Sequence, residues 1–118
     1  MAAGLTAYRS GLAAEDAVWR HYARRGYALA ARRWRSKAGE IDLITRKDGM
    51  VIFTEVKHAR DFATAAARLG PRQLGRIVRS AEAYLADEPR ALDTVARIDV
   101  ALVDGSGRIE IIENATAA

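Results

Sequence analysis

Cysteine is absent from this 118-residue sequence, which excludes disulfide bonds and thiolate metal sites. No apolar run approaches the length of a membrane span, and the N-terminus lacks the apolar core of a signal peptide. The two histidines, His21 and His58, have no metal-ligand partner at a suitable spacing. These absences predict a cytoplasmic protein with no membrane association, in which oxygen atoms would have to hold any metal ion.

Hydrophobic residues make up 50% of the chain, enough for a core, and the length predicts one domain over residues 1–118 with an ordered core at about 6–113. The charge is uneven. Residues 1–60 hold 12 lysines and arginines against 6 acidic residues, and residues 61–118 hold 7 against 9. A basic N-terminal half and a pI near 9.8 favour an anionic partner, of which nucleic acid is the commonest.

Hydrophobic periodicity and turn residues predict an α/β fold in which helices flank a central mixed sheet. A stripe of Tyr8, Leu12, Trp19 and Tyr22 predicts a first helix, and a second pattern begins at Pro71. The expected helices cover about 6–25 and 71–88, an irregular segment covers 59–70, and the expected strands cover 27–34, 39–46, 50–58, 97–103 and 108–113. Within the fourth of these strands, Asp99 is expected to pair with Arg97.

The dipeptide Asp48-Gly49 lies between two apolar runs and predicts a two-residue hairpin turn. Such a turn would place Asp42 opposite Glu55, and Glu40 opposite Lys57, on one sheet face; a longer loop would shift this pairing. The other face, formed by Ile41, Leu43, Ile52 and Val56, is apolar, so these strands should be covered on both sides.

Two facing carboxylates among apolar residues repel each other unless they share a proton or hold a cation. Oxygen ligands favour a hard divalent ion such as magnesium or manganese, and Asp42 and Glu55 are the candidate ligands. Lys57 lies on the same face and can orient a water or stabilise negative charge, as attack on a phosphodiester requires. The alternative is a solvated hairpin face on which Lys57 forms ordinary ion pairs with Glu40 and Glu55.

Glu15 falls in the centre of the apolar stripe of the first helix, with no basic residue at helical spacing. A buried acid needs a tertiary partner. Either Glu15 is a third carboxylate that points at the hairpin site, or it forms a salt bridge to one of the many arginines.

Glu15, the run Gly39-Glu40-Ile41-Asp42-Leu43-Ile44 and the run Phe53-Thr54-Glu55-Val56-Lys57 resemble the YraN family over about residues 11–103. These bacterial proteins are similar to restriction endonucleases and archaeal Holliday junction resolvases. The resemblance implies the PD-(D/E)XK nuclease fold, with Asp42, Glu55, Lys57 and Glu15 as catalytic residues. It also implies magnesium-dependent cleavage of DNA, branched or junction DNA included, and resolvase-like enzymes often act as homodimers.

The sequence departs from the expected pattern at three positions, the first of which is usual for this family. Ile41 stands where the general nuclease signature has proline, Gln73 where a lysine is expected, and Arg60 follows Lys57 by three positions rather than two. These departures leave the acids intact and put the rate and the substrate contacts in question.

The candidate nucleic-acid contacts are basic or polar residues before the hairpin and on the second helix: Arg32, Arg33, Arg35, Lys37, Arg72, Gln73 and Arg76. Trp34 is expected in the core, and a solvated helix face is an equal alternative for the helix arginines. A binding module without catalysis on the same fold, or a small structural protein with exposed, ion-paired acids, are the competing hypotheses to a nuclease.

Overall fold

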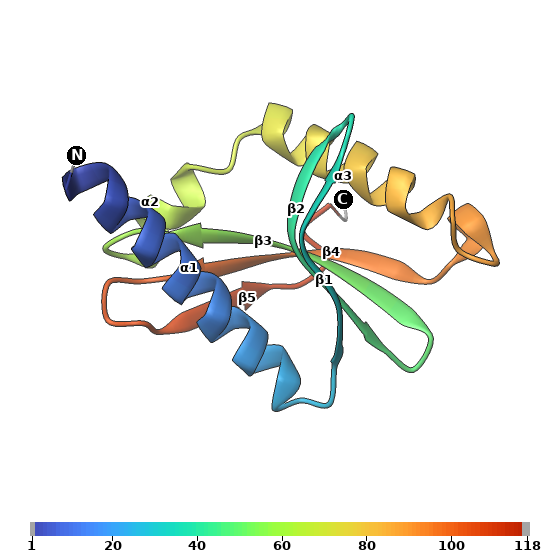
Figure 1. The fold of residues 1–118 in the computed structure, drawn as a ribbon, viewed down its shortest axis with the longest axis horizontal. Coiled ribbons are helices and arrows are strands. Elements are labelled where there is room, and N and C mark those ends of the chain that lie inside the picture. The colour runs from blue at the N-terminus through green and yellow to red at the C-terminus, as the bar shows by residue number, and fades with distance from the viewer. Residues whose placement is uncertain (1, 117–118) are drawn as a thin grey trace.

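The computed structural model describes residues 2–116, with side chains from Arg9 onward. Five strands form one sheet in the order β1-β2-β3-β4-β5, and helices lie against it (Figure 1). The strands are β1 (Ala28–Ser36), β2 (Gly39–Lys47), β3 (Met50–His58), β4 (Ala96–Val103) and β5 (Ile109–Ile112). The helices are α1 (Ala2–Ala23), α2 (Phe62–Ala67), α3 (Pro71–Leu85) and the 3-10 turn η1 (Ala91–Asp93).

This mixed sheet with flanking helices confirms the predicted α/β fold and is consistent with the restriction-endonuclease-like architecture. Strands β1, β2 and β3 pair antiparallel, β3 and β4 pair parallel, and β5 returns antiparallel. A parallel pair requires a long crossover, which α2 and α3 supply. No helix within residues 2–116 has the length and apolar character to cross a membrane.

The element boundaries follow local signals closely. Helix α1 begins at Ala2, earlier than expected, and ends before Gly26, whose φ of +85° is a left-handed conformation that glycine adopts at low cost. The irregular segment contains α2, where the carboxylate of Asp61 accepts a hydrogen bond from the N–H of Thr64 at 2.7 Å. Pro71 occupies the first turn of α3, as its sequence position predicted.

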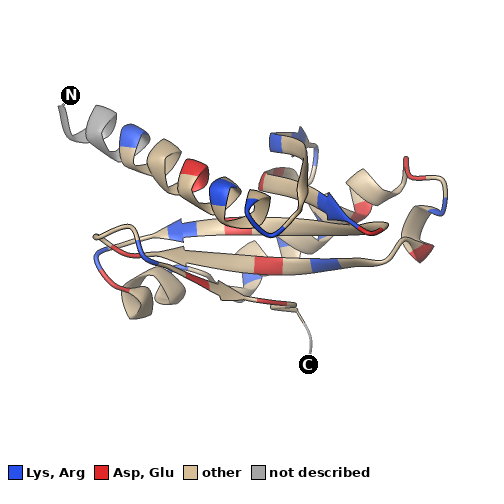
Figure 2. Cartoon of the chain, turned by 90° about the horizontal axis from the view of Figure 1, so that it is seen from below, with Lys and Arg blue, Asp and Glu red and all other residues tan. Residues whose placement is uncertain are grey.

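Helices cover both faces of the sheet, as the apolar strands predicted. Helix α1 covers one face through a buried cluster of Ala14, Val18, Tyr22, Leu43, Ile52, Ala101 and Val103. Helix α3 covers the other through Ile41, Ile44, Val51, Phe53, Ile77, Ala81, Leu85 and Ile98. Figure 2 shows α1 and α2 on opposite sides of the sheet.

Two details of this packing differ from the prediction. Ile41 was expected on the same face as Leu43 and Ile52 but packs with Ile44 and Trp34 in the α3 cluster. Side-chain alternation is therefore broken between Ile41 and Leu43, beside Arg33 of β1, which has a φ of +51°. The buried stripe of α1 runs through Ala14 and Val18, which places Glu15 at its edge, and the side chain of Tyr8 lies outside the described residues.

A buried polar network joins α1, β3 and β4 on the α1 face. Asp99 is fully buried and accepts two hydrogen bonds from the guanidinium of Arg97, at 2.9 and 3.1 Å. The Tyr22 hydroxyl donates to Asp99 at 2.7 Å and accepts from Thr54 at 3.1 Å, and the N–H of Asn114 donates to Asp99 at 3.1 Å. The expected Asp99–Arg97 pair is thus present, within a larger network.

Replacing Arg97 with methionine should destabilise the fold strongly, because it leaves the Asp99 carboxylate buried without its counter-charge. We expect a loss of about 3–5 kcal/mol in the free energy of unfolding, measured by urea denaturation. Arg60→Met is the matched control, since its ion pair with Asp61 is exposed and should contribute less than about 1 kcal/mol. Equal losses in the two variants would contradict this account.

Candidate active site

The hairpin of β2 and β3 has the two-residue turn that the sequence predicted. Asp48 and Gly49 both have positive φ, 52° and 79°. The strands pair in the expected register from Lys47 and Met50 at the turn to Leu43 and Thr54. The ladder ends there, one residue before Asp42 and Glu55, so the two acids lie where the strands begin to separate.

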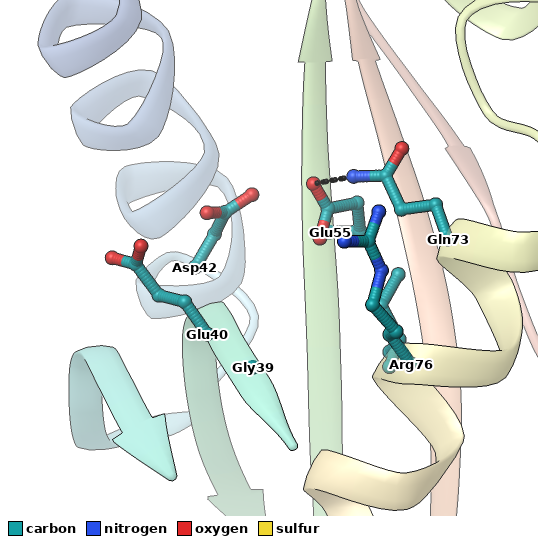
Figure 3. A pocket seen from close by; sticks show the side chains of 7 residues that line it. Gly39, Glu40, Asp42, Glu55, Gln73 and Arg76 are labelled. Atoms are coloured by element: carbon teal, nitrogen blue, oxygen red, sulfur yellow. Dashed lines mark hydrogen bonds between the residues drawn. The ribbon is translucent and has the colours of Figure 1, made fainter. Parts of the chain in front are cut away.

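A contact between a side chain and the backbone lies where β2 and β3 separate. The carboxylate of Asp42 accepts the backbone N–H of Val56 at 2.8 Å, so a side chain links the strands where the ladder stops. Beyond this point β3 stays paired with β4 as far as His58, while β2 stays paired with β1 as far as Gly39. Figure 3 shows Asp42 and Glu55 on opposite sides of the resulting gap.

The predicted pair of Glu40 and Lys57 is wrong for the same reason. Glu40 lies beyond the divergence, is exposed and pairs across the β1–β2 ladder with Arg35. Lys57 is left to other partners on the α3 side of the sheet.

Glu55 is buried, with 7% of its surface exposed, and Asp42 is half-buried. Each carboxyl group affects the pKa of the other, so the two side chains are close neighbours. Burial, followed by the charge of Asp42, raises the pKa of Glu55 to about 8. Burial also raises the pKa of Asp42, and the nearby charges of Glu15 and Glu40 act in the same direction. The pair therefore favours a shared proton or a bound cation over two free negative charges.

Lys57 and Gln73 complete the surroundings of Glu55. The ammonium of Lys57 lies 3.5 Å from Oε1 of Glu55 and donates a hydrogen bond to Oε1 of Gln73 at 2.9 Å. The amide Nε2 of Gln73 donates to the same Glu55 oxygen at 3.3 Å (Figure 3). Gln73, expected as a nucleic-acid contact, thus joins the acid and the lysine through α3. The sequence signal for this role was only its place in the first turn of that helix.

An open cavity of about 220 Å³ gives access to the acid pair. Gly39, Glu40 and Asp42 line it from β2, Glu55 from β3, and Gln73, Arg76 and Ile77 from α3 (Figure 3). Gly39 allows this close approach of hairpin and helix, because a Cβ at its position would lie 3.3 Å from Oγ of Ser80. Gly39 and Val56 lie within the two runs that carry the family resemblance, but the sequence did not indicate what the N–H of Val56 or the missing side chain at Gly39 would do.

Glu15 forms the tertiary salt bridge that was one of its two expected roles. Its carboxylate accepts hydrogen bonds from Nε and Nη2 of Arg33 at 3.0 and 3.3 Å, and Arg32 lies 3.8 Å away. Its charge is still close enough to Asp42 to help raise the pKa of that acid. Glu15 is therefore a neighbour of the acid pair whose oxygens are bound to arginine.

The donor set fits a divalent ion held by few protein ligands. No group of three or more histidine, cysteine, aspartate or glutamate side chains within the described part of the chain is arranged to bind a metal. Asp42 accepts from Val56 through Oδ2 and Glu55 accepts from Gln73 through Oε1, so Oδ1 of Asp42 and Oε2 of Glu55 are the candidate ligand atoms. Magnesium commonly binds through one or two carboxylates, with water and substrate phosphate completing its shell. Asp42 and Glu55 in an open cavity meet that requirement.

The predicted basic patch divides into two groups. Arg32 and Arg33 are paired with acids of α1, Arg32 with Asp16 at 2.7 Å and Arg33 with Glu15. The side chains of Arg35, Lys37, Arg72 and Arg76 are exposed, on the β1–β2 hairpin and on α3. Trp34 packs edge-on against Tyr84 with ring centroids 5.3 Å apart, so it belongs to the core as expected.

Comparisons with known proteins agree on one family. A family model described as "Uncharacterised protein family UPF0102" matches residues 14–103. A UPF0102 protein of Cereibacter sphaeroides is 56% identical over 98% of this chain and 98% of its own length. UPF0102 proteins of Ruegeria pomeroyi and Dinoroseobacter shibae are 54% and 40% identical over 95% and 98% of this chain, and 91% and 86% of their own lengths.

The raised pKa of Glu55 should make metal-free stability depend on pH. Because the folded protein retains a proton that the unfolded chain releases, the free energy of unfolding should fall as the pH rises from the ordinary 4.5 toward about 8. Glu55→Gln should remove this fall and be more stable than the parent at pH 8 by on the order of 1–3 kcal/mol. Urea denaturation of the parent and of Glu55→Gln at pH 5 and pH 8 measures these differences in the free energy of unfolding. Glu110→Gln, at an exposed position, is the control, and a pH slope unchanged in Glu55→Gln would refute the assignment.

If the anionic partner is DNA, Arg35 and Lys37 of the exposed group should contribute more to its binding than exposed arginines elsewhere on the chain. Replacing Arg35 and Lys37 together with alanine should lower the slope of log K against log salt by about 1–2, because each phosphate contact contributes about 0.7–0.9. Arg24→Ala with Arg90→Ala removes the same charge from exposed positions elsewhere. Fluorescence anisotropy on a labelled DNA at several salt concentrations gives the slope for each double variant. Equal slopes for the two variants would count against contact between DNA and the β1–β2 hairpin.

Proposed function

This chain belongs to the UPF0102 family, known also as the YraN family, and from that premise we propose that it is a metal-dependent endonuclease that hydrolyses phosphodiester bonds in DNA. One observation carries the proposal. The buried carboxyl group of Glu55 and the half-buried one of Asp42 line an open cavity, and the Lys57 ammonium lies 3.5 Å from Glu55. Two like charges in a site with little water repel each other, and a divalent ion with a phosphate bound to it would relieve that repulsion.

Asp42 and Glu55 would hold Mg²⁺ or Mn²⁺ through the oxygens that face the gap. When bound, the ion would neutralise charge on the phosphate and lower the pKa of a coordinated water. The chain contributes the rest. The N–H of Val56 fixes the Asp42 carboxylate, and burial excludes bulk water from Glu55, so the attraction between the acids and a cation is strong.

Lys57 would orient the attacking water and stabilise the negative charge that develops on the phosphate. Its ammonium lies 3.5 Å from Oε1 of Glu55 and donates to Gln73, and both of these residues line the cavity. Arg76 lines the same cavity with an exposed side chain and would bind a phosphate oxygen. An ammonium and a guanidinium beside two acids suit phosphoryl transfer, in which charge stabilisation is the main requirement.

The substrate would be DNA held through its backbone. Arg35 in β1, Lys37 in the turn between β1 and β2, and Arg72 and Arg76 on α3 carry exposed positive charge, and β2 and α3 are two of the elements that line the cavity. Phosphate contacts position a nucleic acid without reading its bases, so we propose recognition of DNA shape, such as a flap or a junction, rather than of sequence. A symmetric junction would need two copies of the site, which a homodimer would supply.

A cleavage assay tests the catalytic residues. Linear duplex, single-stranded, flapped and four-way-junction DNA are incubated with Mg²⁺ or Mn²⁺ and with each of Asp42→Asn, Glu55→Gln and Lys57→Met. We expect each variant to cleave at least about 100-fold more slowly than the parent, because each removes a ligand or a charge stabiliser. Asp87→Asn, an exposed acid beyond the end of α3, is the control and should keep the parental rate.

The same assay discriminates the alternatives. Metal-dependent cleavage at the parental rate in both Glu55→Gln and Lys57→Met would reject the assignment. Binding of DNA by the parent protein without cleavage of any of the four substrates would instead identify a binding module without catalysis on this fold.

A further inference from the structure

Gln73 lies between the two charged groups that the proposed reaction needs. Its Nε2 donates to Oε1 of Glu55 at 3.3 Å and its Oε1 accepts from the ammonium of Lys57 at 2.9 Å. The partners are 18 and 16 positions away in the sequence, so the contacts are tertiary. Figure 3 shows the Gln73 side chain directed from α3 toward Glu55.

We propose that Gln73 is a positioning residue that holds the Lys57 ammonium away from the Glu55 carboxylate, so that Glu55 can bind a divalent cation and Lys57 can act on the substrate. This inference rests on the proposed function and names a residue that sets the geometry of the same site. Gln73 does not touch the reacting atoms in this account. It acts through Lys57 and Glu55.

A carboxamide is suited to this place because it carries a donor and an acceptor and no charge. Its NH₂ group faces the carboxylate and its carbonyl oxygen faces the ammonium, so both contacts are satisfied at once. A lysine here would have only donors and would repel Lys57. A glutamate would have only acceptors and would repel Glu55 and, through it, the acid pair.

The distance between Lys57 and Glu55 shows what the amide prevents. At 3.5 Å the ion pair is longer than the 2.7–2.9 Å or so of a charge-assisted hydrogen bond, while the bond from Lys57 to Gln73 is short. Without the amide, the ammonium would close onto Glu55 and neutralise it. A divalent cation would then have to displace Lys57 before it could bind.

The start of α3 fixes where Gln73 stands. Gly70 and Pro71 set the first turn, and Gln73 follows within it. One turn further along, Ile77 is anchored in the core cluster on this sheet face, so the helix cannot rotate to move the amide away. The bridge is therefore held from outside the hairpin that carries Glu55 and Lys57.

The first test observes the amide itself. Gln73 is the only glutamine and Asn114 the only asparagine in the sequence, so a ¹⁵N spectrum contains two side-chain carboxamide groups. We expect the Gln73 signals to shift in Lys57→Met and in Glu55→Ala, neither of which adds a carboxamide, and the Asn114 signals to stay in place as an internal control. Gln73 signals that respond to neither substitution would overturn the bridge, whatever the activity of the protein.

The second test is a double-mutant cycle on metal binding, with Mn²⁺ alone as the probe. Gln73→Leu should weaken Mn²⁺ binding by about tenfold, as loss of an outer-shell partner commonly does. In a Lys57→Met background the same substitution should have less than about a twofold effect, because no ammonium remains to compete. An equal loss in both backgrounds would show a merely structural role and overturn the proposal. Glu82→Gln, exposed on α3, controls for changes to the helix.

Cleavage by Gln73→Leu separates this inference from the proposed function. We expect kcat to fall by about 10–100-fold with KM for DNA changed by less than about threefold, since the amide positions groups rather than holding DNA. If the cycle behaves as expected but no DNA is cleaved by the parent, the nuclease proposal fails and the positioning of Lys57 stands. If the parent cleaves and Gln73→Leu cleaves equally well, the positioning role fails and the nuclease proposal stands. Absence of Mn²⁺ binding to the parent would refute both.

Discussion

Two carboxyl groups that share one buried gap cannot both ionise without compensating positive charge, and the architecture around β2 and β3 follows from this constraint. Asp42 and Glu55 each receive a hydrogen bond through one oxygen, from the N–H of Val56 and from the amide of Gln73. Lys57 stands close to Glu55 but shares its ammonium with Gln73. The acids are thus oriented by these contacts, and in the proposed reaction a cation would take the place of the proton that the pair otherwise favours.

The sheet stays continuous across this gap, because β3 remains paired with β4 after its pairing with β2 has ended. Near the turn it pairs with both β2 and β4, and from Glu55 onward the pairing with β4 alone continues. The network around Asp99 fastens β4 to α1 and β3 on the opposite face. Because β4 and the Asp99 network hold β3 in place, β2 can separate from β3. This separation opens the cavity through which solvent reaches Asp42 and Glu55.

Local signals in the sequence predicted most of the fold and the residues of the candidate site. The Asp48-Gly49 turn sets a register by steric rules alone, and Asp42, Glu55 and Lys57 follow from it by alternation. The end of the ladder could not be predicted, because it depends on one contact between a side chain and the backbone of Val56. The partner of Glu15 and the face of Ile41 likewise depend on the distortion of β1 at Arg33, for which no local pattern exists.

The fold also changes what the net charge means. Arginine gives the chain its charge of +4, yet Arg32, Arg33, Arg46 and Arg97 are each paired with an acid in the structure. The basic side chains that remain exposed near the cavity are Arg35, Lys37, Arg72 and Arg76, on the hairpin and on α3. Attraction of an anionic polymer depends on charge that solvent can reach, so these four, more than the total charge, would determine how a nucleic acid approaches. Arg72 and Arg76 lie on α3, which lines the cavity, and Arg35 and Lys37 lie just before β2, so a strand that they bound would pass close to Glu55.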